Sequence, residues 1–275
     1  MKEFRGRVAA ITGAGSGIGR ALAEALAARQ ADLALSDVDY RGLAETAARC
    51  RRYGVTVTTS HLDVADRNHV FDWAERVVTD HGRANLLVNN AGVALSANIV
   101  DMAFEDFEWL MNINFWGVVH GTQAFLPHLE ASGEGHIVNL SSVFGLMAIP
   151  TQSAYDSAKF AVRGFTDALR MELEIAESRV SATTVHPGGV KTNIVRNARM
   201  SEEFAAEAHE FTDRFERQAR STPADAAAQI LQAVERNRRR CLVGPDSKVF
   251  DLVSRLPAAI PQRLLAAVQR RQRHR

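Results

Sequence analysis

The sequence predicts an α/β fold, with a doubly wound parallel sheet of about seven strands and helices on both faces. Short apolar runs alternate with longer amphipathic segments, which is the pattern of repeated strand–helix–strand units. The runs are apolar at nearly every position, as strands are when helices cover both faces of their sheet. The expected strands are residues 8–11, 33–35, 55–59, 86–88, 136–140, 180–185 and 241–243, and the expected helices are residues 18–29, 68–81, 105–129, 155–177 and 224–237.

The expected strands extend over almost the whole chain of 275 residues, and no Pro-, Gly- or Ser-rich linker separates them. We therefore expect a single domain over residues 1–275. Two segments interrupt the alternation of strands and helices. Residues 193–221 form an insertion before the last strand, and residues 246–275 form an extension in which apolar residues mix with arginines.

Composition and charge exclude several classes of protein. Lys and Arg number 33 and Asp and Glu number 32, so the net charge of +1 provides no overall attraction to nucleic acid. The two cysteines, Cys50 and Cys241, lie far apart and no Cys/His spacing matches a metal site, so we expect neither a disulfide framework nor a metal. No signal-peptide pattern is present and no apolar run approaches the roughly 18 residues of a membrane-spanning helix, which predicts a cytoplasmic protein.

A glycine-rich loop follows the first expected strand and opens a helix. Glycines at Gly13, Gly17 and Gly19 allow a tight turn and let a pyrophosphate approach the backbone amides, while Ser16 and Ile18 lie between them. The amino end of the following helix adds free N–H groups and a partial positive charge. The loop therefore predicts a dinucleotide-phosphate site, with a plain tight turn as the alternative.

Asp37 ends the second expected strand, where a carboxylate can accept hydrogen bonds from an adenosine ribose. The same carboxylate repels a 2′-phosphate, and neither Ser16 nor Val38 supplies a compensating cation. NAD is therefore favoured over NADP, although Arg41 is close enough in sequence to leave NADP open. A solvated residue at a strand end is the alternative interpretation of Asp37.

Tyr155 and Lys159 are four residues apart and therefore lie on one face of a helix. A phenol has a pKa of ~10, and an ammonium within ~4–6 Å can lower it so that the phenol accepts a proton. By itself such a pair is usually found on a solvated face. Ser142, directly after the strand at 136–140, adds a hydroxyl at the carboxyl edge of the sheet, where open parallel sheets bind ligands.

With these motifs in this order, residues from about 5 to 245 resemble the short-chain dehydrogenase/reductase family, whose fold is Rossmann-like. The resemblance implies four catalytic residues, a set of cofactor-binding residues and a set of substrate-binding residues. The catalytic positions are Asn114, Ser142, Tyr155 and Lys159. The cofactor positions are Gly13, Ser16, Gly17, Ile18, Gly19, Asp37, Asp63, Val64, Asn90, Ala91, Gly92, Tyr155, Lys159, Pro187, Gly188, Val190 and Thr192.

The implied reaction is hydride transfer between NAD and a secondary alcohol or ketone, with Tyr155 as the acid/base. Ser142 would hydrogen-bond the reacting oxygen, and Lys159 would lower the pKa of Tyr155 and bind the nicotinamide ribose. Asn114 would hold a water that links Lys159 to solvent through an irregularity in the helix backbone. The family resemblance also implies a homo-oligomer, a dimer or a homotetramer, paired through helices 105–129 and 155–177.

Substrate selectivity is expected from Ser142, Phe144, Ile149, Tyr155 and Gly188. The insertion 193–221, with Phe204, Phe211 and Phe215, resembles the lid of the family. These residues predict an apolar substrate of lipid, terpenoid or steroid type. Two alternatives stay open: an NADPH-dependent carbonyl or 3-oxoacyl reductase, and a non-catalytic dinucleotide sensor or scaffold.

The basic extension has two interpretations. No acidic residue follows Asp251, whereas six arginines do, among leucine, isoleucine and valine residues. Such a segment can form an amphipathic helix that makes weak contact with a membrane surface. The other interpretation, which the sequence favours, is that it packs across a neighbouring subunit.

Overall fold

The computed structural model describes residues 1–201, 204, 212–213, 217 and 219–273. The strands are β1 (Val8–Thr12), β2 (Asp32–Asp37), β3 (Val57–His61), β4 (Leu86–Asn89), β5 (Leu95–Ser96), β6 (Gly135–Leu140), β7 (Val180–Pro187), β8 (Arg199–Met200) and β9 (Arg240–Val243). The α-helices are α1 (Gly17–Ala28), α2 (Tyr40–Arg51), α3 (Arg67–His81), α4 (Phe104–Met111), α5 (Gly117–Ala131), α6 (Ser153–Ile175), α9 (Pro223–Glu235), α10 (Pro245–Val253) and α11 (Ala259–Arg273).

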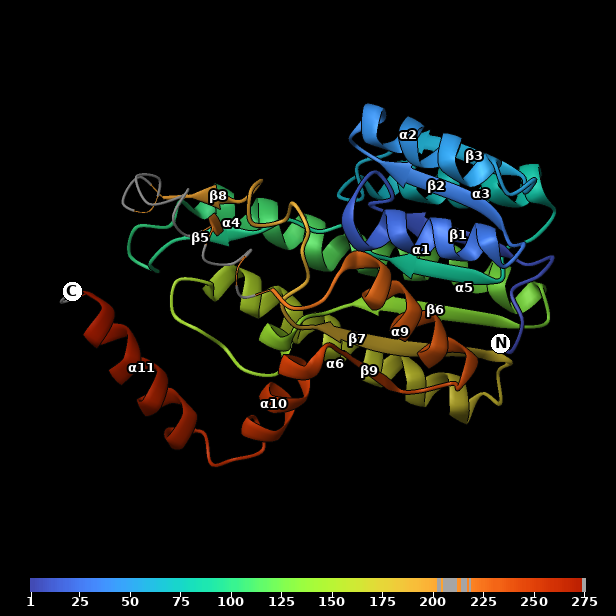
Figure 1. Cartoon of the computed structure of the whole chain (residues 1–275). Helices are drawn as coiled ribbons and strands as arrows, with labels where there is room; N and C mark the ends of the chain where they lie inside the picture. Colours follow the sequence, from blue (N-terminus) through green and yellow to red (C-terminus); the bar gives the residue numbers. More distant parts are fainter. Residues whose placement is uncertain (202–203, 205–211, 214–216, 218, 274–275) are drawn as a thin grey trace.

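The main sheet has seven parallel strands in the order β3-β2-β1-β4-β6-β7-β9. The predicted fold class is therefore confirmed, and each of the seven expected strands overlaps one strand of this sheet. Figure 1 shows the sheet crossing the molecule with helices in front of it and behind it.

Two apolar cores fill the spaces between the sheet and its helices. Helices α1, α2 and α9 cover one face, where Leu22 and Ile230 belong to the same buried cluster as Ile11 of β1. Helices α3, α5 and α6 cover the other face, where Trp73 and Phe125 pack edge to face with ring centroids 5.0 Å apart. Successive residues of a strand point to opposite faces, so an apolar side chain is needed at every position.

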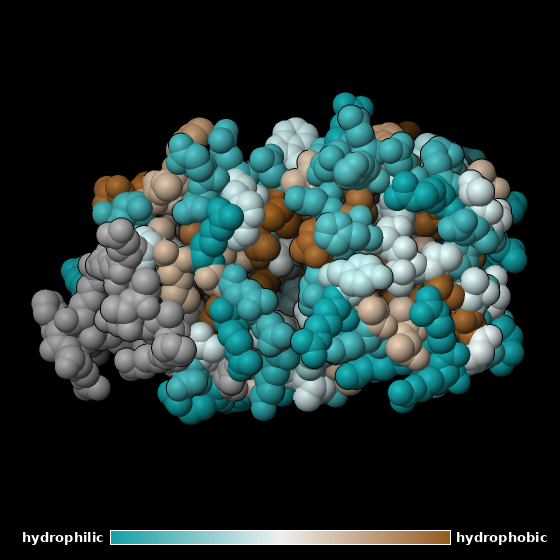
Figure 2. Space-filling view, turned by 90° about the horizontal axis from the view of Figure 1, so that it is seen from above, coloured by the Kyte–Doolittle hydropathy of each residue, from teal (hydrophilic) through white to brown (hydrophobic). Residues whose placement is uncertain are grey.

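The direction in which successive strands are added to the sheet reverses between β1 and β4. The connections after β1 build the sheet toward β3, whereas the strands after β4 build it toward β9. The loops that leave the carboxyl ends of β1 and β4 therefore diverge and leave a crevice, which is where open α/β sheets bind ligands. Figure 2, which views the molecule from above, shows a hollow near the middle of the molecule with hydrophobic residues at its border.

Helical structure differs from the expectation in two places. Helix α2 was not among the expected helices, because its apolar residues alternate with Gly42 and several arginines. The long helix expected at 105–129 is divided by a π-helical turn, η1 (Asn112–Trp116), which separates α4 from α5. This turn is a backbone irregularity of the kind expected around Asn114.

The insertion 193–221 contributes a short strand. β8 pairs in parallel with β5 and so joins the insertion to the loop after β4. At the other end of the insertion, Ser221 forms a bridge with Val190. Phe211 and Phe215, which were expected to belong to the lid, lie outside the described residues. The lid therefore stays a prediction.

The extension begins with α10, which packs close to the carboxyl ends of β7 and β9, and continues as α11, away from the sheet (Figure 1). Within the described part of the chain, no helix has the length and apolar character needed to cross a membrane.

Candidate active site

The glycine-rich loop is joined to the loop after β4 by one hydrogen-bonded clamp. The Asn90 side chain donates from Nδ2 to the carbonyl oxygens of Thr12 and Gly13, at 2.9 Å and 3.0 Å. In return, Thr12 Oγ1 accepts the backbone N–H groups of Asn90 and Ala91, at 3.0 Å and 3.1 Å. The two loops are therefore held close together at the point where the sheet reverses its strand order.

The short distance between the two clamped loops requires glycine at two of the predicted positions. Gly13 has a φ of +64°, and a Cβ there would lie 2.8 Å from Asn90 Nδ2. A Cβ at Gly19 would overlap the Gly13 carbonyl oxygen. The side chain of Ser16 makes no capping hydrogen bond to α1, so the first amides of this helix keep their donors for a ligand.

Asp37 lies at the end of β2, beside the loop. Its Oδ2 accepts the N–H of Gly15 at 2.7 Å, and its Oδ1 accepts the N–H of Asp39 at 2.8 Å. The carboxylate is thus fixed at the mouth of the crevice. Arg41 points away, with a 92% exposed side chain 3.7 Å from Glu45.

The other predicted cofactor residues lie around the same crevice. Asp63 is exposed directly after β3, and Val64 is buried against Gly117. A Cβ at Gly92 would lie 3.3 Å from Asn114 Oδ1 and 3.6 Å from Lys159 Nζ, which brings the loop after β4 next to the predicted catalytic residues. A Cβ at Gly17, on the glycine-rich loop, would lie 3.2 Å from Thr192.

The loop after β7 depends on a residue that the sequence did not indicate. Asp246, at the start of α10, accepts the N–H of Gly189 on Oδ2 at 2.6 Å. Its carboxylate occupies the space that a side chain at Gly188 would need. Pro187 ends β7, and the following Val190 is buried through its bridge to Ser221. Residues 187–192 are therefore held from one side by the extension and from the other by the insertion.

Ser142 follows β6 in extended conformation, and its hydroxyl accepts the N–H of Phe144 at 3.2 Å. Its carbonyl oxygen contacts Nδ1 of the buried His186 at 2.9 Å. Burial lowers the pKa of His186 to about 4, so the imidazole is neutral and Nδ1 is the donor. The neighbouring Ser141 instead donates its hydroxyl to the Lys159 carbonyl oxygen, which leaves Ser142 as the hydroxyl toward Tyr155.

Helix α6 brings Tyr155 and Lys159 to Ser142. Lys159 is only 3% exposed, its Nζ lies 5.4 Å from the centre of the Tyr155 ring, and it donates to the Leu140 carbonyl oxygen at 2.9 Å. The three side chains predicted from the sequence are therefore adjacent, at the carboxyl edge of β6.

The expected lowering of the tyrosine pKa is not found in this structure. Burial raises the pKa of Tyr155 to about 12, and hydrogen bonding from Ser142 opposes that rise only in part. Burial also lowers the pKa of Lys159 to about 8, which weakens the ammonium that was expected to act on the phenol. Tyr155 is therefore a protonated phenol at neutral pH.

Asn114 is fully buried in the π-helical turn. Its side chain is paired in both directions with the backbone of Val93: Oδ1 accepts the Val93 N–H and Nδ2 donates to the Val93 carbonyl, each at 2.8 Å. The amide therefore fixes the loop after β4 to the π-helical turn η1, and its role in holding a water stays a prediction.

Aromatic rings form a wall beside Tyr155. Phe144 lies edge to face with Tyr155 at a centroid distance of 6.3 Å, and Phe250 of α10 packs on Phe144 at 6.1 Å. Phe250 was not foreseen as part of this wall. The predicted substrate residue Gly188 lies nearby, on the loop held by Asp246.

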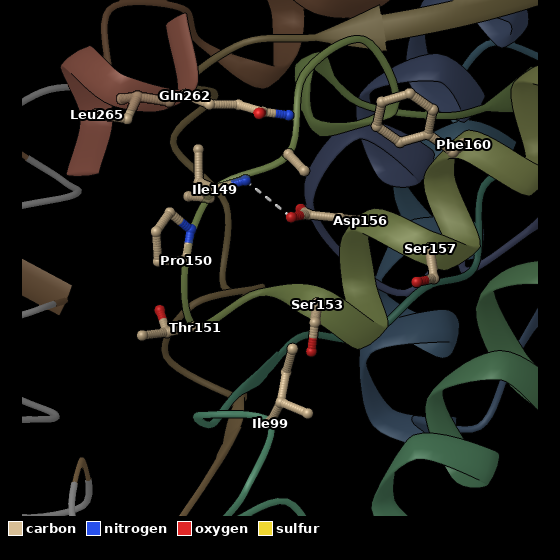
Figure 3. A pocket seen from close by; sticks show the side chains of 11 residues that line it. Ile99, Ile149, Pro150, Thr151, Ser153, Asp156, Ser157, Phe160, Gln262 and Leu265 are labelled. Carbon is tan, nitrogen blue, oxygen red and sulfur yellow. Dashed lines mark hydrogen bonds between the residues drawn. The ribbon is translucent and has the colours of Figure 1, made fainter. Parts of the chain in front are cut away.

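Ile149, the remaining predicted substrate residue, lines a pocket of about 520 Å³ between α6 and α11 (Figure 3). The backbone N–H of Ile149 donates to Asp156 Oδ2 at 2.9 Å, and the pocket extends from there to Phe160, Ile99 and Leu265. Neither Tyr155 nor Ser142 lines this pocket. The role of Ile149 in substrate binding therefore stays a prediction.

Among the residues described, no group of three His, Cys, Asp or Glu side chains could hold a metal ion. The site combines a dinucleotide-binding loop, placed where the strand order of a parallel sheet reverses, with an adjacent serine, tyrosine and lysine. This combination defines a dinucleotide-dependent oxidoreductase.

Comparison with known proteins agrees with this class. The family model described as short chain dehydrogenase matches residues 7–203. The "Putative oxidoreductase SadH" of Mycobacterium tuberculosis is 49% identical over 97% of this chain and 96% of its own length. Human "Estradiol 17-beta-dehydrogenase 11" is 30% identical over 98% of this chain and 84% of its own length.

A solved structure of a short chain dehydrogenase/reductase from Burkholderia phymatum, in complex with NAD, has a TM-score of 0.88 and 31% identity over 96% of this chain and 97% of that one. The chain belongs to the short-chain dehydrogenase family, and it is an oxidoreductase.

Replacing Asp246 tests the hydrogen bond that joins the extension to the site. We expect Asp246→Ala to raise the KM for the dinucleotide by about tenfold, because the loop at 187–192 loses a charge-assisted hydrogen bond. Steady-state kinetics with varied cofactor would measure the change. Asp72→Ala, at an exposed position on α3, is the control and should leave this KM unchanged. An unaltered KM in Asp246→Ala would show that the loop holds its position without the extension.

Proposed function

We propose that this protein transfers a hydride between NAD and a secondary alcohol or its ketone, with Tyr155 as the acid/base. The observation that carries the proposal is the convergence of Ser142, Tyr155 and Lys159 on the edge of the crevice formed by the glycine-rich loop. Bound NAD supplies the hydride acceptor and, in its oxidised form, a positive charge.

The residues around the crevice fit this cofactor. The phosphates would lie on the amides that follow Gly13, and the adenosine ribose would meet the fixed Asp37 carboxylate. Asp63 and Val64 would contact the adenine, and residues 187–192 would hold the carboxamide. NAD is favoured over NADP because Arg41, the nearest candidate for a 2′-phosphate, extends into solvent toward Glu45. The NAD complex of the similar Burkholderia phymatum structure supports the same choice.

The chain's own residues would move the proton. In ketone reduction, the protonated Tyr155 donates its hydroxyl proton to the carbonyl oxygen while Ser142 hydrogen-bonds the same oxygen. In alcohol oxidation, Tyr155 must first lose that proton. A charged Lys159 then stabilises the phenolate, and the π-helical turn at Asn114 offers a backbone route by which water relays the proton to solvent.

We infer an apolar substrate of lipid, terpenoid or steroid type, since Phe144 and Phe250 form an aromatic wall next to Tyr155. The name of the similar estradiol dehydrogenase supports a bulky apolar alcohol. An NADPH-dependent carbonyl or 3-oxoacyl reductase is the second candidate, because the neutral phenol of Tyr155 suits proton donation.

We further propose a cytoplasmic homotetramer built from one domain per chain. The support is the apolar surface that η1 and α6 leave exposed, with Trp116 47% exposed and Met171 55% exposed. Monomeric proteins seldom expose such residues on adjacent helices without a partner.

Tyr155→Phe removes the proton carrier and keeps the ring. We expect kcat to fall by about 10²–10⁴-fold across a panel of lipophilic secondary alcohols, while the affinity for NAD changes little. Stopped-flow and equilibrium fluorescence measurements separate the two quantities. Tyr53→Phe, far from the site and exposed, should behave as the parent. Parental turnover in Tyr155→Phe would rule out the proposed acid/base.

The raised pKa of Tyr155 sets the pH dependence. The phenol is protonated at neutral pH, so the fraction of phenolate grows as the pH rises toward its pKa of about 12. We expect kcat/KM for alcohol oxidation to rise by up to about tenfold per pH unit from neutral pH to about pH 8, where Lys159 begins to lose the charge that stabilises the phenolate, and ketone reduction to be flat or fall. An oxidation rate that falls over this range would contradict the assignment.

Asp37→Ala tests cofactor choice. Removing the carboxylate that would face a 2′-phosphate should shift the ratio of kcat/KM for NAD over that for NADP by about tenfold or more toward NADP. The two constants are measured with the same alcohol. Asp72→Ala, which changes the net charge by the same amount away from the crevice, should leave the ratio unchanged.

A further inference from the structure

We propose that α10 and α11 bind the surface of an anionic phospholipid membrane through an apolar stripe flanked by arginines. The stripe consists of Leu252, Leu256, Ile260, Leu264 and Val268. This inference is independent of the substrate and of the direction of the reaction.

The stripe is exposed along its whole length. Exposure is 68% for Leu252, 54% for Ile260 and 65% for Leu264, and 47% and 45% for Leu256 and Val268. The main cores of the protein are complete without these residues. Single exposed apolar residues need no explanation, but five of them within 17 residues of chain indicate a contact surface.

The apolar stripe lies on one side of α11, and a different side of this helix contacts the rest of the protein. Ile260, Leu264 and Val268 are spaced by four residues and so share a face. Pro261 is buried, and Leu265 lines the pocket shared with α6 (Figure 3). The helix is therefore already held by its inner side, and its outer apolar side has no partner in the described chain.

Charge favours a lipid surface as that partner. Arg263 and Arg270 are exposed and seven residues apart, which is about two helical turns, so they lie on one side of α11 next to the stripe. No acidic residue follows Asp251, and Asp251 is itself paired with Arg255 at 2.7 Å. Apolar residues enter the boundary between headgroups and acyl chains, while arginines contact anionic headgroups.

A second copy of α11 is a poor partner for the same reason. Two such helices packed stripe to stripe would bring arginines against arginines with no carboxylate to separate them. The 15 residues of α11 measure roughly 22 Å along the helix axis, which suits a helix that lies on a bilayer rather than one that spans it.

The stripe lies beside another exposed apolar segment. Ile99 and Val100, in the loop after β5, are 78% and 90% exposed, and Ile99 lines the same pocket as Leu265. A bilayer that contacts α11 would therefore also lie near the mouth of this pocket.

Co-sedimentation of the full-length protein with vesicles tests the proposal. We expect binding to vesicles of phosphatidylcholine with phosphatidylglycerol, no binding to phosphatidylcholine alone, and weaker binding as salt is added. The triple variant Ile260→Ser, Leu264→Ser and Val268→Ser should bind the anionic vesicles at least about tenfold more weakly. The pair Arg263→Gln and Arg270→Gln should weaken binding by about 30-fold.

The matched control is the pair Arg52→Gln and Tyr53→Ser, an exposed arginine and an exposed aromatic residue after α2, which should bind as the parent does. All variants should keep parental turnover of a water-soluble alcohol, which shows that they fold. Absence of binding by the parent to anionic vesicles overturns the proposal. So does a triple Ser variant that binds vesicles as the parent does. If that variant also sediments as a smaller oligomer, the stripe is a contact between copies.

Discussion

The hydrogen bonds between Asn90 and the end of β1 are the interaction on which the rest of the site depends. Where the strand order of a parallel sheet reverses, the loops that follow the two neighbouring strands run in opposite directions. The hydrogen bonds of the sheet do not limit how far these loops separate. Asn90 and Thr12 set that separation with four hydrogen bonds. The close approach leaves no space for side chains at Gly13 and Gly19. The glycines are therefore needed for packing against Asn90 as well as for admitting a phosphate.

A second buried network extends from this point to α6. Asn89 donates to Asn139 at 2.8 Å, and Asn139 donates to Thr166 of α6 at 3.0 Å. Buried polar groups are costly unless they are hydrogen-bonded, and bonds of defined geometry allow only one arrangement of the elements they join. These hydrogen bonds thus fix α6, which carries Tyr155 and Lys159, in position relative to β4 and β6. His186 adds a third connection, between the end of β7 and the backbone of Ser142.

The sequence predicted those features that local pattern determines. Strand runs covered on both faces are apolar throughout, and a glycine-rich loop between a strand and a helix has few other uses, so the sheet and Gly13, Gly17 and Gly19 could be foreseen. Helix α2 was missed because it covers the sheet with few apolar residues. Asp246 and Phe250 were missed for a different reason. Asp246 lies 57 residues from Gly189 and Phe250 far along the chain from Phe144, and no spacing rule connects them. The pKa of Tyr155 also escaped prediction, since burial opposes the neighbouring charge and only coordinates show how deep the phenol lies.

The contact between Asp246 and Gly189 has a consequence for how the protein is made. A ribosome releases the glycine-rich loop, Ser142, Tyr155 and Lys159 well before Asp246, which follows the last strand of the sheet. A nascent chain that has reached residue 244 thus contains every side chain proposed for catalysis, yet its loop after β7 still lacks the carboxylate that holds it. We therefore expect a chain whose translation stops before the extension to bind the cofactor more weakly than the finished protein does.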